Sequence, residues 1–443
     1  MKRFLLPLLL GAAAHPLGAS AQNTNLNPAL ISYQAFLVGY NIPRDKQDYL
    51  TTNLWHGGQL PAAAGADQRF YDAEFKLLRQ AAHCRVPADW GLDLSNGPEL
   101  LLPHLARAKQ VAVVDRARFA WDLQNGRPEA AREDWIATLA LARNLANDGV
   151  LISALVQIAM ENILLGTVAE NCHQIPPATL RELAAALDTA PARGTMATVI
   201  AGAEKESFCG WFIHRVEAER ALHPGDEAAA LAGVRQLLLN TMSTGDAPDA
   251  QSTVTGRVDE ILAAAHGTTA GVLALLQPLT ALYDRAAALA REPAAVFEAR
   301  AADFQNEIRG ATNNPFVGEF FPALSNCRRK EIAVLSRLAM LRAAAAYRAQ
   351  GAAGLAAVPD PATGAPFKFE RFLFQGVDRG FRLTSAYVPP GRPAFAAGGA
   401  TPAAPAAPGY AETLIFVERP GAPFLVDGPP AGDAVPTAAA TAK

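Results

Sequence analysis

The chain has 443 residues and a formal net charge of −3 at pH 7, from 39 basic and 42 acidic side chains. Half of the residues are hydrophobic and only 18% are charged, which excludes a highly charged disordered protein. The near balance of charge also excludes binding to nucleic acid through bulk positive charge. A chain of this length has room for two or three domains.

The first 21 residues have the pattern of a secretory signal peptide. Lys2 and Arg3 are followed by an apolar stretch at 4–14, and residues 19–21 (Ala-Ser-Ala) form a small-x-small cleavage site. The apolar stretch is too short to span a bilayer. We therefore expect cleavage after Ala21 and a mature protein that is secreted or periplasmic.

Changes in composition divide the rest of the chain. The predicted parts are N-terminal helices and loops (22–97), a helical domain (98–351), a small β-rich module (352–418) with a Pro/Ala/Gly-rich insert (389–409), and a flexible tail (419–443). The insert is either a tether or an unusually long loop of the small sheet.

Apolar residues at helical spacing predict helices along most of the first 350 residues. The predicted helices are 28–38, 67–83, 100–125, 128–147, 150–171, 178–187, 195–222, 227–242, 254–265, 270–290, 294–309 and 327–350. The clearest unit is the antiparallel hairpin of 100–125 and 128–147. Gly126 suits the left-handed cap of its first helix, and Pro128 suits the first turn of its second. A polar loop is expected at 243–252.

The segment 150–171 is apolar enough to be mistaken for a membrane span. It contains Gln157, Glu161 and Asn162, and a carboxylate in the middle of a bilayer is costly. We interpret the segment as a buried helix of a soluble domain, and we expect no transmembrane span in the mature chain.

The C-terminal module has the period-two pattern of strands. Strands are predicted at 367–374, 381–388 and 413–418, with a hairpin turn at 378–380. The predicted fold class is therefore mainly α, with antiparallel helical hairpins in an irregular α-solenoid or bundle and a small C-terminal antiparallel β module.

Four short motifs carry a resemblance: Asp-Trp-Gly at 89–91, Gly-Pro-Glu-Leu-Leu at 97–101, Gly-Arg-Pro-Glu-Ala at 126–130 and Leu-Ile-Ser-Ala-Leu-Val at 151–156. With them, the chain resembles an uncharacterised family of exported, alanine-rich bacterial helical proteins. The resemblance implies a helical fold and no known activity.

Two parts of the chain resemble other groups. The helical hairpin resembles a tetratricopeptide-type unit, with Ala120, Gly126 and Ala130 in matching places. Residues 342–387 are similar to the C-terminal module of the exported family, and distantly to the globular part of type II secretion pseudopilins. The pseudopilin leader and its Glu-bearing membrane helix do not occur in this sequence, so pilus assembly is not implied.

The chain has four cysteines, at Cys84, Cys172, Cys209 and Cys327. Export permits disulfides, and four cysteines allow three pairings between which the sequence does not choose. Buried free thiols or one disulfide are both compatible with the spacing. A zinc site has little support because the sequence has no Cys-x-x-Cys motif. We expect no metal and no cofactor.

The common catalytic signatures, namely GxGxxG, GxxxxGK[ST], HExxH and GxSxG, do not occur. The best local candidate is the stripe Ser153, Gln157 and Glu161, whose four-residue spacing puts them on one helix face. Burial would raise the pKa of the Glu161 carboxyl and suit it to acid–base work. The alternative is that Glu161 pairs internally with an arginine or faces a partly wet groove.

A second candidate group is Glu204, Glu206, His214 and Glu217. His214 and Glu217 are three residues apart, so they could share a metal or a proton. The alternative is a solvated charged face on which the histidine forms a salt bridge.

We expect an exported helical scaffold or interaction protein that binds a protein or peptide partner in the cell envelope. The reasons are the helical hairpins and the lack of a catalytic signature. One alternative is a hydrolase-type enzyme that uses the helix-borne carboxylates Glu161 and Glu204. Another is an accessory of secretion or envelope assembly.

Overall fold

The computed structural model describes residues 25–47, 60, 62–242, 248–310, 314–320, 324–390 and 410–419. Within these residues the chain is mainly helical, with a three-stranded antiparallel sheet near the C-terminal end. The predicted fold class is therefore confirmed. The predicted signal peptide, residues 391–409 of the predicted insert and residues 420–443 of the predicted tail lie outside the described residues.

The helices follow the predicted order closely. They are α1 (Pro28–Tyr40), α3 (Ala62–Gln68), α4 (Asp72–Ala82), α5 (Pro103–Gln124), α6 (Pro128–Leu145), α7 (Leu151–Glu170), α8 (Pro177–Thr189), α9 (Met196–Val199), α10 (Trp211–Leu222), α11 (Glu227–Met242), α12 (Pro248–Ala264), α13 (Thr269–Arg291), α14 (Ala294–Gly310), α15 (Pro315–Phe320), α16 (Leu324–Gln350) and α17 (Ala352–Ala356). The strands are β1 (Lys368–Phe374), β2 (Val377–Thr384) and β3 (Thr413–Val417).

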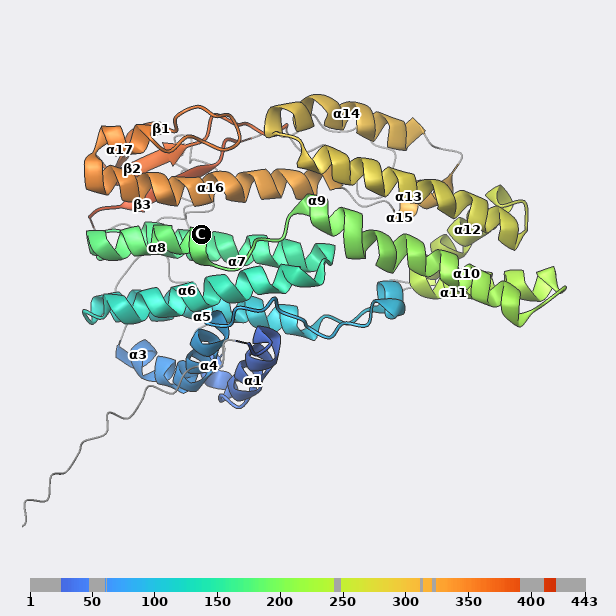
Figure 1. Ribbon diagram of the computed structural model, residues 1–443, viewed down its shortest axis with the longest axis horizontal. Helices are drawn as coiled ribbons and strands as arrows, with labels where there is room; N and C mark the ends of the chain where they lie inside the picture. The colour runs from blue at the N-terminus through green and yellow to red at the C-terminus, as the bar shows by residue number, and fades with distance from the viewer. Residues whose placement is uncertain are drawn as a thin grey trace, which may run out of the picture.

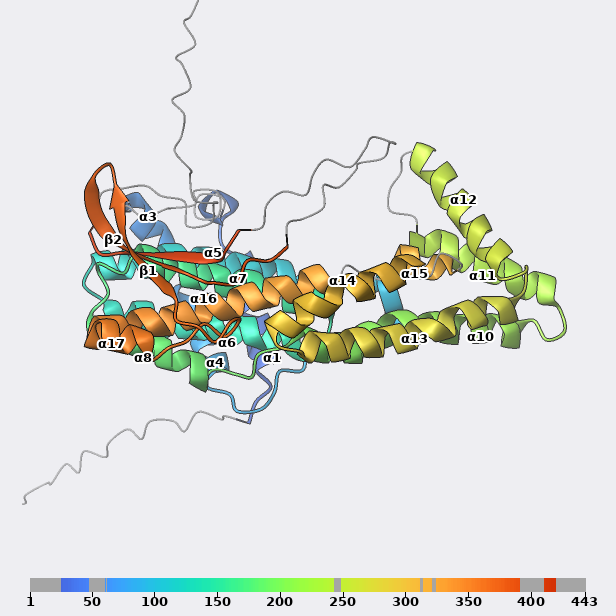
Figure 2. The same ribbon diagram turned by 90° about the horizontal axis from the view of Figure 1, so that it is seen from above.

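The molecule consists of a wide body and a narrower arm (Figures 1 and 2). In the body, α5, α6, α7, α8 and α16 lie lengthwise beside one another, with α1, α3 and α4 on one side and the sheet on the other. The arm is formed by α10, α11, α12 and α13, and it extends from the end of the body where α9 lies.

The predicted hairpin of α5 and α6 is confirmed. Gly126 has a φ of +67°, the left-handed conformation in which a residue without a Cβ meets no steric penalty. Pro128 occupies the first turn of α6, where its missing N–H leaves no intrahelical partner unpaired. The side chain of Trp135 is fully buried against α7, and its Nε1–H donates to the carbonyl of Leu164 at 3.0 Å.

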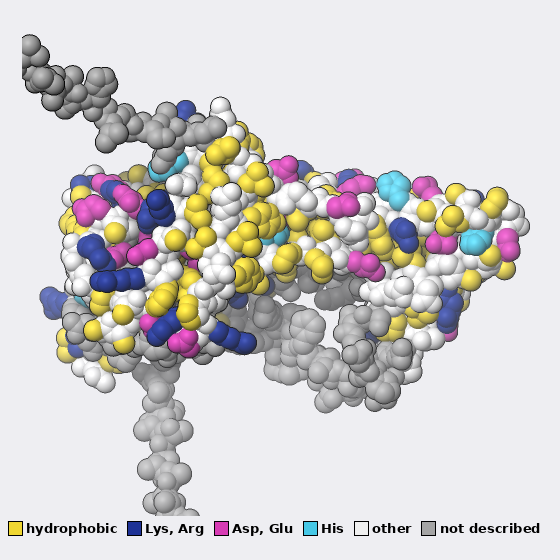
Figure 3. Space-filling view, turned by 90° about the horizontal axis from the view of Figure 1, so that it is seen from below, with side chains coloured by type: hydrophobic (Ala, Val, Ile, Leu, Met, Phe, Trp, Pro, Cys, Tyr) yellow, Lys and Arg dark blue, Asp and Glu magenta, His cyan; other side chains and the backbone are white. Residues whose placement is uncertain are grey.

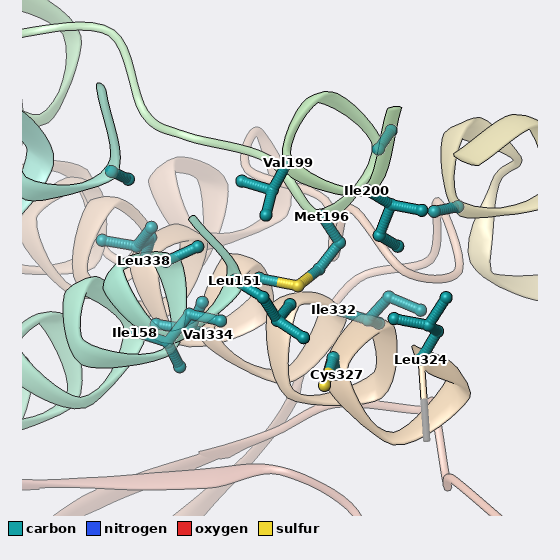
Figure 4. Packing of buried hydrophobic residues seen from close by; sticks show 14 of the residues in the cluster. Leu151, Ile158, Met196, Val199, Ile200, Leu324, Cys327, Ile332, Val334 and Leu338 are labelled. Carbon is teal, nitrogen blue, oxygen red and sulfur yellow. The ribbon is translucent and has the colours of Figure 1, made fainter. Parts of the chain in front are cut away.

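The body and the arm share a continuous apolar core. Figure 4 shows the junction, where Leu151 and Ile158 of α7 lie close to Met196 and Val199 of α9 and to Val334 of α16. A second core lies between α1, α4, α5 and α6, so the N-terminal helices pack on the same hairpin as the rest of the body. Alanine is frequent on these helices, and its small side chain favours both helix and close packing.

Several local predictions were wrong. Helix α12 begins at Pro248, inside the predicted loop 243–252, and the short helix α15 was not expected. The hairpin turn of the sheet lies at Gln375 and Gly376, both with positive φ, whereas residues 378–380 belong to β2. Two successive positive φ angles are the geometry of a tight hairpin turn. Gly380 instead permits close pairing, because a Cβ there would lie 2.0 Å from the carbonyl oxygen of Phe416 in β3.

The small sheet is held to α16 by aromatic packing and by one buried carboxylate. Phe381 of β2 stacks on Phe416 and contacts the ring of Tyr347 from α16. Asp360 is fully buried and accepts hydrogen bonds from the hydroxyls of Ser336 on α16 (2.7 Å) and Ser385 after β2 (2.5 Å). Asp360 therefore links α16 to the end of β2 through its two carboxylate oxygens.

Replacing Asp360 by alanine leaves the hydroxyls of Ser336 and Ser385 without their acceptor. We expect Asp360→Ala to lower the free energy of unfolding by about 1–3 kcal/mol and to speed proteolysis within residues 357–390. Urea denaturation and limited proteolysis followed by mass spectrometry measure both effects. The control is Asp378→Ala in the same sheet, whose partly exposed pair with Arg371 is worth about 1 kcal/mol or less. Equal effects of the two substitutions would contradict this role of Asp360.

Candidate functional site

The predicted stripe on α7 lies on one helix face, and its three side chains are fully buried. The hydroxyl of Ser153 donates to Asp148 at 2.5 Å. The amide of Gln157 accepts from the backbone N–H of Gly194 at 3.0 Å and donates to its carbonyl at 3.4 Å. These two side chains therefore satisfy backbone and loop groups that would otherwise be buried without partners.

Glu161 pairs internally with arginine. Its Oε2 lies 3.0 Å from Arg193 Nε, and its Oε1 lies 3.5 Å from Arg143 Nε. Arg193 continues to Glu331 of α16 at 3.1 Å, and Glu331 binds Arg328 at 2.6 Å. This buried ion-pair network joins α6, α7, α16 and the segment between α8 and α9. Glu161 has no exposed surface, so the arrangement gives it a structural role.

Glu204 occupies a different place, in a groove at the start of α7. We call this the Glu204 groove; its volume is about 280 Å³, and it is lined by Gly97, Pro98, Leu100, Leu102, Val150, Leu151, Ile152, Leu155, Glu204, Ser207 and Phe208. Glu204 Oε2 accepts the backbone N–H of Leu151 at 3.3 Å, at the first turn of α7. Burial raises the pKa of the Glu204 carboxyl, and this hydrogen bond offsets part of the rise. Glu161 does not line the groove, so the two carboxylates do not share it.

The backbone around Glu204 departs from the regular α-helix. Between α9 and α10 the helix is interrupted at Gly202, whose φ of −103° and ψ of −118° are not helical, and residues 206–210 are wound as π-helix. The sequence predicts one continuous helix over 195–222, so this prediction was wrong. Such wider turns are uncommon and frequently lie at functional sites. Glu204 lies between the break at Gly202 and this wider turn, and its carboxylate contacts the first turn of α7.

The rim of the Glu204 groove is apolar and exposed. Leu101, next to the groove-lining Leu100 and Leu102, is 82% exposed, and Ile152 of α7 is 47% exposed. Figure 3 shows a wider apolar band over the body on one face of the molecule, whereas charged side chains gather at the outer end of the body. Helix α1 contributes exposed Leu30 and Leu37 to the protein surface.

The remaining predicted residues do not converge on one site. Glu206, His214 and Glu217 are exposed, and Glu217 lines an open hollow between α10 and α11 together with His223. Among the residues that the structure describes, no group of three or more His, Cys, Asp and Glu side chains could hold a metal ion.

All four cysteines lie within the described residues and are free thiols. Burial raises the pKa of Cys172 to about 11 and that of Cys209 to about 12. Both thiols are therefore protonated and unreactive at neutral pH, since the thiolate is the reactive form.

Sequence reasoning missed a polar cavity between α3, α4, α5 and α6. Its volume is about 550 Å³, and its walls carry four arginines and three aspartates. On α5, Asp115, Arg118 and Asp122 recur at intervals of three and four residues, so charged side chains follow one face of a largely buried helix. That spacing was the signal in the sequence that could have located the cavity.

Helix α7 is the one helix in the described parts of the chain that alone is long and apolar enough to cross a membrane; the bent pair of Ser252–Ala264 and α13 would be a second candidate if taken together. In the structure α7 packs against α5, α6 and α16. Comparison with known protein families, curated proteins and solved structures finds no match.

Removing Arg193 from the buried ion-pair network leaves the carboxylates of Glu161 and Glu331 buried with less positive charge to balance them. We expect Arg193→Met to lower the free energy of unfolding by about 3–5 kcal/mol, as breaking a buried pair does. The control, Arg235→Met, removes a largely exposed pair with Asp259 on the arm and should cost about 1 kcal/mol or less. Urea denaturation compares the two. A loss for Arg193→Met no larger than for the control would contradict the network's role.

Burial of Asp148 makes the stability of the fold depend on pH. Burial raises its pKa to about 6, although the hydrogen bonds from Ser153 and the Val150 N–H act in the opposite direction. The unfolded chain ionises this group near pH 4. Stability should therefore fall as the pH rises from about 4 to about 6, because the folded state retains the proton longer.

The measurement is the free energy of unfolding of wild type and Asp148→Asn at several pH values. We expect the difference between them to change by up to about 3 kcal/mol across this range, with wild type losing stability toward the higher pH. Asp303→Asn, at an exposed position on α14, is the control. A pH-independent difference for Asp148→Asn would exclude the effect.

Proposed function

We propose that this protein is an exported helical scaffold that binds a protein or peptide partner in the cell envelope through the Glu204 groove. The basic and apolar start of the chain and the small residues at 19–21 support export. The observation that carries the binding proposal is an apolar rim around a half-buried carboxylate.

The size of the groove favours a peptide over a small molecule. Its volume of about 280 Å³ lies at or below the lower end of the range of roughly 300–1,000 Å³ for small-molecule sites. The exposed side chains of Leu101 and Ile152 extend the contact surface beyond the groove itself. A groove for one or two side chains with apolar neighbours is the kind of site that a peptide segment fills with alternate anchors.

The charge of the groove indicates which side chains it would accept. Glu204 is the one ionisable side chain among the residues that line the groove. A lysine or arginine of a partner would pair with its carboxylate, and the pair would form in a place where burial already disfavours an unpaired charge. The preferred segment therefore carries Lys or Arg between large apolar residues.

A hydrolase-type enzyme remains a second proposal, favoured by the raised pKa of Glu204 beside the hydroxyl-bearing Ser207. It rests on Glu204 alone, because Glu161 is enclosed between Arg143 and Arg193. An accessory role in secretion or envelope assembly is one form that partner binding could take.

Selection from a random displayed peptide library tests the binding proposal. We expect enriched peptides in which Lys or Arg stands between large apolar residues. The substitutions Ile152→Asp and Glu204→Gln should each weaken binding of the selected peptide about tenfold or more. Leu222→Asp, at an exposed apolar position on the arm, should leave binding unchanged. Peptides that bind all three variants equally, or a library that yields none, would overturn the proposal.

A further inference from the structure

The polar cavity between α3, α4, α5 and α6 is a second site, separate from the Glu204 groove. Its volume of about 550 Å³ lies inside the range typical of small-molecule sites. It combines small residues of α3, the indole of Trp121 from α5, and charged side chains of α4, α5 and α6.

Most of the charges in the cavity already balance one another. Asp134 is almost fully buried and pairs with Arg118 at 2.9 Å and also with Arg79. Asp122 pairs with Arg127 at 2.5 Å. These pairs hold their side chains in fixed positions, so the walls of the cavity are preorganised.

Two donors in the cavity have no partner among the described residues. Gln68 is only 3% exposed, yet its Nε2 makes no hydrogen bond. A buried donor without an acceptor destabilises the folded protein, and a ligand that supplies the acceptor would remove this cost. The side chain of the neighbouring Arg69 is exposed and forms no ion pair or hydrogen bond with any described residue, although its backbone carbonyl accepts the N–H of Asp72. With four arginines and three aspartates, the cavity carries one surplus positive charge.

The cavity walls contain both donors and acceptors of hydrogen bonds, and this favours some classes of ligand over others. Asp72 and Asp122 pair with Arg118 and Arg127, but their carboxylates still have lone pairs that can accept hydrogen bonds. A simple anion offers only acceptors, so it would bring no donors to these carboxylates. Hydroxyl groups both donate and accept, so they suit walls that contain carboxylates as well as guanidinium and amide groups. The indole of Trp121 adds a flat apolar surface for a ring.

From these contacts we propose that the cavity binds a sugar acid, a small ring with several hydroxyl groups and one carboxylate. The carboxylate pairs with Arg69, an oxygen of the ligand accepts from Gln68 Nε2, and other hydroxyls donate to Asp72 and Asp122. The ring lies against Trp121.

Isothermal titration of the full mature chain with glucuronate, galacturonate, glucose and acetate tests this proposal. We expect at least one uronate to bind saturably and more tightly than both glucose and acetate. Arg69→Ala should weaken that binding about tenfold or more, the effect of one charge-assisted hydrogen bond. Arg300→Ala, at an exposed arginine of α14, should not change it.

Because Arg69 is exposed, Arg69→Ala should fold normally, and thermal unfolding verifies this. The proposal is overturned if neither uronate binds, if acetate binds as tightly as the uronates, or if uronate binding survives Arg69→Ala. These outcomes leave the Glu204 groove unaffected, since the two sites share no lining residue.

Discussion

The buried ion-pair network around Arg193 is the constraint on which the arrangement of the molecule depends. Arg193 lies between α8 and α9 and binds Glu161 of α7 and Glu331 of α16. Glu331 also accepts the backbone N–H of Met196, the first residue of α9, at 3.1 Å. One set of charges therefore fixes three long helices of the body and the point at which the chain enters the arm. Buried charges are costly to desolvate, and this cost is offset only when the charged groups meet at hydrogen-bond distance. The network therefore favours one arrangement of the helices.

Apolar packing around the network supplies the main stabilising free energy. At the junction, apolar side chains of α7, α9 and α16 lie close together (Figure 4). Hydrophobic contact is non-directional and tolerates sliding of one helix on another. Ion pairs and the two hydrogen bonds between Gln157 and Gly194 require one register. Apolar packing thus supplies most of the stability, whereas the ion pairs and hydrogen bonds fix the register of the helices.

The helices were predictable because their apolar periodicity and their caps are local properties, as at Gly126 and Pro128. The candidate site was predictable only in part. The spacing of Gln157 and Glu161 indicated one buried face. Two of their partners, Gly194 and Arg193, lie more than thirty residues away and a third, Arg143, lies on α6, and no local pattern identifies such partners. The irregular backbone at 200–210 was also missed, because the apolar spacing over 195–222 is that of a continuous helix and carries no signal for the break at Gly202.

Helix α7 connects this network to the proposed binding groove. Its middle carries Gln157 and Glu161, and its first turn contributes Leu151 and Ile152 to the groove. A helix held at its middle by ion pairs, and at its first turn by hydrogen bonds to Asp148 and Glu204, has little freedom to move when a partner binds. A rigid site loses less conformational entropy on binding than a mobile one. The buried charges that hold α7 in place therefore also preorganise the groove that its first turn lines.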